Sequence, residues 1–135
     1  MSDRPERGVL DTSALISLAD LDPDSLPREP VITAITLAEL SVGPLVAADP
    51  AERAARQAHL QQAEADFEPI PFDAAAARAF GHVAAELRSA GRKRAARAYD
   101  ALIAATAIAH GFPVYTTNAA DFEGINGLTV HDVTR

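Results

Sequence analysis

The sequence predicts an α/β fold in which a central, mainly parallel sheet of four to five strands is covered by helices on both faces. Two observations support this class and its organisation as a single domain. Short apolar stretches alternate along the chain with segments of helical periodicity, which is the pattern of parallel sheets. The 135 residues contain no cysteine, so they fit a single domain, residues 1–135, with one hydrophobic core and no disulfide framework.

Composition limits the classes of partner. The net charge is −7, so most of the surface would repel a phosphate backbone, and any contact with nucleic acid must be local. No apolar run approaches the roughly twenty residues of a membrane span, and the polar start, MSDRPERG, lacks the apolar region of a signal peptide. We therefore expect a cytoplasmic protein with no membrane partner.

The first strand is expected at residues 8–10, and it ends at Asp11. Residues 12–20 then take helical spacing. Asp11 stands at the carboxyl end of a strand, but Asp11, Thr12 or Ser13 could equally serve as the cap of this helix. Taken alone, the segment favours the cap.

The second strand is expected at residues 31–35, after a polar loop over residues 20–30 that carries three prolines. Thr36 and Glu39 have the spacing of a capping box, and Gly43-Pro44 would stop the helix that they begin. A glutamate in the first helical turn also points past the end of the preceding strand. Both interpretations of Glu39 stay open.

Two longer helices follow. Asp49-Pro50 is a good start for a polar, exposed helix that runs to Phe67. Residues 69–72 are too proline-rich for a central strand and predict a short edge strand. Asp73 would cap the next helix, and Gly91 would end it.

A basic segment comes next, and it is the one concentration of positive charge. Residues 86–97 have a local balance of +4 in a chain that is otherwise at −11. The segment is either solvated surface or a contact for a phosphate chain. Its basic residues are Arg88, Arg92, Lys93, Arg94 and Arg97.

The helix expected over residues 95–110, which Gly111 would end, carries one unusual residue, Asp100. It shares a helical face with Ile103 and Ala104, and a charge on an apolar face needs a partner. That partner is either a cation such as Arg97 or a metal ion.

The last part of the chain predicts a buried strand at residues 113–116 and an edge strand at residues 127–131. Asn118 and Asp121 lie just past the first of these. Asn118 is a good N-cap, and Asp121 would sit in the first turn, where the helix dipole favours it.

Parallel sheets bind ligands beyond the carboxyl ends of their strands. Asp11, Glu39 and Asp121 each follow a predicted strand, and Asp100 precedes the strand that leads to Asp121. Independent caps would not need to fall at one edge of one sheet, so we expect the four carboxylates to share a pocket.

Oxygen ligands without cysteine or paired histidine favour Mg²⁺ or Mn²⁺, and Mg²⁺ commonly bridges carboxylates to substrate phosphates. This chemistry points to phosphodiester hydrolysis by a metal-activated water. The four histidines have no metal-ligand spacing, and we expect them at the surface or at helix ends. They are His59, His82, His110 and His131.

Four segments together resemble the PIN-domain ribonucleases, and among them the VapC toxins of toxin-antitoxin pairs. They are VLDTSALI, ITLAELSVG, YDALIAATAIAHG and VYTTNAADFEGI. The resemblance implies a three-layer α/β/α fold, a Mg²⁺ or Mn²⁺ cofactor, an RNA substrate, a homodimer and a cognate antitoxin. It assigns the catalytic acids to Asp11, Glu39, Asp100 and Asp121, and the metal to Asp11, Asp100 and Asp121. It gives Thr12, Ser13 and Asn118 supporting polar roles.

Other functions remain open. Some PIN nucleases have a further acid where this chain has Asn118. A second metal site would therefore lack one carboxylate ligand here. A PIN nuclease that is not a toxin, or a non-catalytic PIN-like module that binds metal or RNA, would carry the same segments. A phosphotransfer receiver requires a well-placed lysine, but the sole lysine of this chain lies in the basic segment. A dehalogenase-like phosphatase requires a D-x-D motif, which is absent at Asp11.

Overall fold

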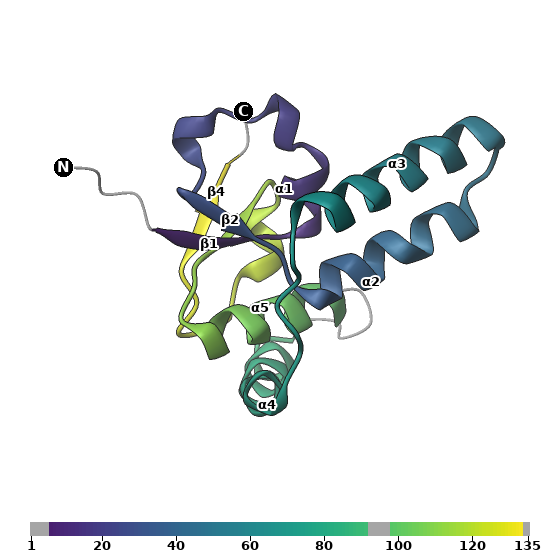
Figure 1. The fold of residues 1–135 in the computed structure, drawn as a ribbon. Coiled ribbons are helices and arrows are strands. Elements are labelled where there is room, and N and C mark those ends of the chain that lie inside the picture. Colours follow the sequence, from purple (N-terminus) through teal and green to yellow (C-terminus); the bar gives the residue numbers. More distant parts are fainter. Residues whose placement is uncertain (1–5, 92–97, 134–135) are drawn as a thin grey trace.

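A computed structural model describes residues 6–91 and 98–133 (Figure 1). Within these residues four strands form one sheet in the order β2-β1-β3-β4, and all three strand pairs are parallel. The predicted parallel sheet is therefore confirmed, and β4 is the predicted edge strand. The strands are β1 (Arg7–Leu10), β2 (Glu29–Val31), β3 (Val114–Thr116) and β4 (Val130–Asp132).

Helices connect the strands. The α-helices are α1 (Thr12–Ile16), α2 (Ala34–Val42), α3 (Pro50–Asp66), α4 (Ala74–Ser89) and α5 (Ala98–His110). Short 3-10 helices are η1 (Leu18–Asp20), η2 (Pro23–Ser25), η3 (Gly43–Val46) and η5 (Ala119–Phe122). No helix in the described ranges is both long and apolar enough to cross a membrane.

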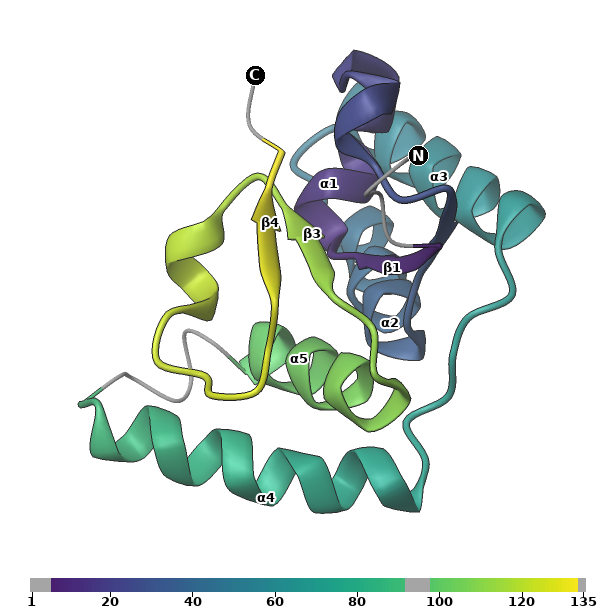
Figure 2. The same ribbon diagram turned by 90° about the vertical axis from the view of Figure 1, so that its left-hand side faces the viewer.

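The sheet is covered on both faces, as Figure 2 shows. Successive residues of a strand point to opposite faces. Val9 and Val114 accordingly join the core formed with α4 and α5, whereas Leu10 and Tyr115 join a second core with α1, α2 and α3. The expected three-layer arrangement is thereby confirmed.

The α2 and α3 helices project together away from the sheet as an arm (Figure 1). Asp49 begins α3 by accepting a hydrogen bond from the Glu52 N–H at 2.8 Å, and Pro50 is the first helical residue, as predicted. Most residues of α3 are exposed, also as predicted. At the tip, Leu45 is 81% exposed.

Three boundaries of the later helices are also confirmed. Asp73 begins α4 by accepting a hydrogen bond from the Ala76 N–H at 3.0 Å. Gly91 and Gly111 follow α4 and α5 with φ of 74° and 72°, values that favour glycine.

Two predictions about strands were wrong. The second strand is Glu29–Val31 rather than residues 31–35, and it begins earlier because an edge strand tolerates Pro30. Residues 69–72 form no strand: Ile70 makes only an isolated bridge to Thr33. Thr33 accepts a hydrogen bond from the Thr36 N–H and caps α2, so the chain leaves the sheet before residues 34 and 35.

Candidate active site

Asp11 is the most buried acid at the carboxyl edge of the sheet, with 4% of its surface exposed. The Ala14 N–H donates to Oδ1 at 2.9 Å, which confirms the predicted cap of α1. Two hydroxyls also donate to this carboxylate: Ser13 to Oδ1 at 2.7 Å and Thr116 to Oδ2 at 2.6 Å. Three donors fix both oxygens, so Asp11 does more than cap a helix.

The pairing of β1 with β3 brings these groups together. Leu10 is in register with Tyr115, so the next residues along the two strands, Asp11 and Thr116, meet at the sheet edge. The Asn118 N–H donates to the Thr116 hydroxyl at 2.9 Å, and the Thr117 N–H donates to the Ser13 hydroxyl at 3.1 Å. A closed set of hydrogen bonds therefore joins two segments that lie about a hundred residues apart.

Thr116 was missed by sequence reasoning. It is fully buried, and its side chain contacts Asp11 directly. The available signal was its position as the last residue of a buried strand, at the edge where the acids were expected.

Glu39 is joined to this edge through Thr12. The Thr12 hydroxyl donates to Glu39 Oε1 at 2.6 Å and lies 3.2 Å from the Thr36 hydroxyl. The predicted capping box was wrong, because α2 begins at Ala34 and its cap is Thr33. Glu39 consequently lies in the second turn of α2, where its carboxylate can accept the hydrogen bond from Thr12 of α1.

Asp100 and Asp121 are both half-buried, and each lies in the first turn of its helix, α5 and η5 respectively. The α5 helix contacts both α2 and η5, so Asp100 stands on the element between those that carry Glu39 and Asp121. Asn118 is exposed at the N-cap position of η5, but among the described residues its side chain makes no capping hydrogen bond.

The basic segment is described only in part. Arg88 is exposed in the last turn of α4, and its other four basic residues, Arg92, Lys93, Arg94 and Arg97, lie outside the described residues. Of the histidines, three are exposed as predicted, and His131 is half-buried and stacks on Tyr115 at 4.6 Å between ring centroids.

The donor chemistry of this edge fits a hard cation, because the groups are carboxylate and hydroxyl oxygens. Asp11 forms no ion pair with the described residues, so a nearly buried charge is held by hydrogen bonds without a positive partner there. In residues 6–91 and 98–133, no three Asp, Glu or His side chains are grouped closely enough to hold a metal ion. The oxygen donors thus suit a divalent cation, but they do not form a closed cage.

Comparison with known proteins identifies the family. The sequence model of the PIN domain matches residues 8–128. The chain belongs to the PIN-domain family. Ribonuclease VapC5 of Mycobacterium tuberculosis is 38% identical over 138 aligned positions, which cover 100% of this chain and 99% of that protein. Ribonuclease VapC4 of the same organism is 37% identical, with 82% and 85% of the two chains covered.

Solved structures place this PIN domain in the VapC group. The VapBC-5 toxin-antitoxin structure from M. tuberculosis matches with a TM-score of 0.81 and 39% identity, over 96% of this chain and 100% of that chain. The DNA-bound VapBC from Salmonella typhimurium matches with a TM-score of 0.74 and 27% identity, over 95% and 98%. The predicted PIN fold and the VapC resemblance are both confirmed.

Proposed function

We propose that this PIN domain is a ribonuclease that acts as the toxin of a toxin-antitoxin pair, with Mg²⁺ or Mn²⁺ as its cofactor. Full-length similarity to a protein named as a ribonuclease supports the activity. The observation that carries the site is the nearly buried Asp11 carboxylate, which is fixed by three donors beside the Thr12–Glu39 pair. This geometry holds charge at the edge where parallel sheets bind their ligands.

In this proposal Asp11, Asp100 and Asp121 would hold the divalent cation, and their carboxylates would have to lie closer together in the loaded protein than they do in this structure. When bound, the ion lowers the pKa of a water and neutralises charge on the phosphate. Ser13 and Thr116 keep the Asp11 carboxylate in one orientation, and Asn118 contributes its N–H to Thr116. No covalent nucleophile is required.

Glu39 accepts the proton that the water loses as its oxygen bonds to phosphorus. The bond from phosphorus to the leaving oxygen breaks, and that oxygen takes a proton from solvent. Thr12 holds Glu39 through Oε1 and thereby aims the carboxylate along the sheet edge. A substitution of Glu39 should therefore lower the turnover number more than it weakens RNA binding.

The proposed partners are an RNA substrate, a cognate antitoxin and a second copy of the chain. The solved VapBC-5 relative belongs to a family of toxin-antitoxin systems, which supports an antitoxin here. The homodimer is an expectation from the family resemblance. Light scattering of the purified chain tests it directly.

The decisive experiment expresses the chain with and without the product of the adjacent reading frame, and then maps the ends of cleaved RNA. We expect growth arrest and discrete cleavage without the neighbouring product, and neither when it is present. Asp11→Asn, which keeps the shape of the side chain, is the matched inactive control. RNA binding without cleavage by the wild-type chain would instead identify a non-catalytic PIN module.

A further inference from the structure

A groove lies beside the candidate active site, between α1 and the arm formed by α2 and α3. Its volume is about 270 Å³, which is room for a single nucleotide rather than for a helix. Thr12 and Glu39 form the wall that it shares with the active site. The side chains of Arg56 and His59, both on α3, also line it.

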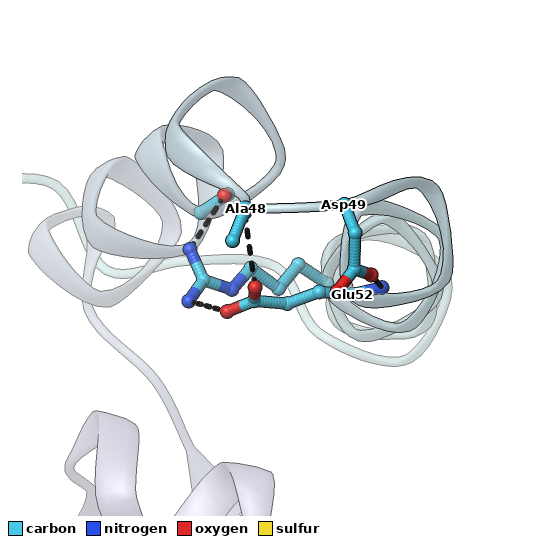
Figure 3. A network of polar contacts seen from close by, with 5 residues as sticks. Ala48, Asp49 and Glu52 are labelled. Carbon is cyan, nitrogen blue, oxygen red and sulfur yellow. Dashed lines mark hydrogen bonds and ion pairs between the residues drawn. The ribbon is translucent and has the colours of Figure 1, made fainter.

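Arg56 is fixed in position at this groove. Its Nη1 donates to the Gly43 carbonyl at 2.9 Å, and its Nη2 pairs with the Glu52 carboxylate. Glu52 is fixed in turn, because its Oε2 accepts a hydrogen bond from the Ala48 N–H at 3.0 Å (Figure 3). A guanidinium has five N–H donors, so these two contacts leave others for a ligand. A donor held in place in advance loses little entropy on binding.

The other lining groups suit the remaining parts of a nucleotide. His59 is exposed and follows Arg56 by three residues on α3, so the two side chains lie on one helical face. Ile16, which is 47% exposed, and Leu40 add an apolar surface to the groove. Phosphate binds to cationic donors, and the face of a base packs on apolar or guanidinium surface.

We propose that this groove binds the nucleotide next to the cleaved bond of the RNA. Its phosphate contacts Arg56 and His59, and its base packs on Ile16 and Leu40. The inference rests on the proposed ribonuclease function, because it is Glu39 that joins the groove to the reacting phosphate. It assigns an RNA contact outside the basic segment, on a chain whose net charge is −7.

The mixture of lining groups favours RNA over a protein segment as the occupant. A neighbouring cavity of about 310 Å³ shares Ile16, Leu40 and His59 but is otherwise lined mainly by apolar side chains such as Phe67, which is the composition of protein interfaces at their centre. The groove beside Glu39 instead places a guanidinium and an imidazole opposite a carboxylate. An apolar peptide would gain nothing from that arrangement.

The test compares four variants of the full chain. Arg56→Gln and His59→Asn each remove a proposed phosphate contact. Glu52→Gln breaks the same ion pair as Arg56→Gln but keeps the cation, so it separates lost charge from a loosened arm. Arg78→Gln removes an exposed positive charge from α4, away from the groove.

Binding is measured by fluorescence anisotropy with a labelled, mixed-sequence, single-stranded oligoribonucleotide, in an Asp11→Asn background that does not cut it. Steady-state cleavage is measured in parallel without that background change. Arg56→Gln should raise KM about tenfold and leave kcat near the wild-type value, because it removes one hydrogen bond to a charged phosphate. It should also lower the slope of log affinity against log salt by roughly 0.7, the value for one phosphate contact on a single strand.

His59→Asn should move KM in the same direction, while Glu52→Gln and Arg78→Gln should keep the wild-type salt slope. Two results would overturn the inference. In one, Arg56→Gln and Glu52→Gln weaken RNA binding equally, which would mean that the ion pair only stiffens the arm. In the other, Arg56→Gln and His59→Asn leave RNA affinity unchanged but weaken binding of the antitoxin, which would make the groove a protein interface. Both results can arise while the wild-type chain still cleaves RNA, so they leave the proposed function intact.

Discussion

Replacing Thr116 by valine removes a hydroxyl from the centre of the candidate site without changing the shape of the side chain. Thr116 is fully buried. It donates to Asp11 Oδ2 at 2.6 Å and accepts from the Asn118 N–H at 2.9 Å. Valine can do neither, so Asp11 keeps only two of its three donors.

The expected loss of stability follows from these two contacts. A hydrogen bond to a charged group contributes about 1.5–3 kcal/mol, and a buried donor left without an acceptor costs a further amount of similar size. Asn118 is exposed, so water can replace part of the second contact. We therefore expect Thr116→Val to lower the free energy of unfolding by about 2–4 kcal/mol, and the melting temperature by about 10 °C.

Thr116→Ser is the matched control, because it keeps the hydroxyl and loses one buried methyl group, at a cost of about 1 kcal/mol. Melting is followed by circular dichroism, and RNA cleavage is measured below the melting range of all three proteins. Thr116→Ser should retain most of the wild-type cleavage rate, and Thr116→Val should lose most of it, since Asp11 is no longer held in one orientation. If serine proved as damaging as valine, the methyl group would matter and the proposed role of the hydroxyl would be wrong.

Three further predictions concern the metal, Asp100 and the basic segment. Millimolar Mg²⁺ or Mn²⁺ should raise the melting temperature, since a ligand of the folded state stabilises it by mass action; no shift with either ion, together with no heat of binding in calorimetry, would contradict the metal site. In the proposed site Asp100 faces other carboxylates, which would repel it by up to about 4 kcal/mol at 4 Å and an effective dielectric of 20. Asp100→Asn should therefore leave the metal-free protein as stable as wild type or more so, and it should abolish cleavage. A destabilised but fully active variant would show instead that Asp100 serves an ion pair. Replacing Arg92, Lys93 and Arg94 together by glutamine should weaken RNA binding and flatten its salt dependence; unchanged values would mean ordinary solvated surface.

The sequence predicted those parts of the fold that depend on local chemistry. Asp49 and Asp73 begin their helices as expected, because a carboxylate that caps an N-terminus acts within its own turn. Gly91 and Gly111 follow their helices for an equally local reason, the positive φ of the residue after a helix. Apolar periodicity predicted β1 and β3, and both are buried.

Local rules failed where a second segment supplied the deciding contact. Spacing favoured Thr36 and Glu39 as a capping box, but Thr33 caps α2 instead. The helix therefore begins earlier, Glu39 moves into the second turn, and its carboxylate meets Thr12. The wrong cap and the contact with Thr12 have one cause, because a glutamate that does not close its own helix can reach the neighbouring one.

The same reasoning explains why Thr116 and Arg56 carried no signal in the sequence. Thr116 was one more polar residue at the end of a strand until the register of β1 with β3 set it against Asp11. Arg56 lies in a polar helix where an Arg and a Glu four residues apart indicate only a solvated pair. Arg56 differs from such a pair because it also donates a hydrogen bond to the carbonyl of Gly43, at the start of the turn between α2 and α3. This bond holds the guanidinium at the groove beside Glu39. Tertiary hydrogen bonds fix the side chains of both residues, and such bonds cannot be predicted from local sequence. We expect the substrate to bind where fixed side chains of this kind line a groove next to Asp11.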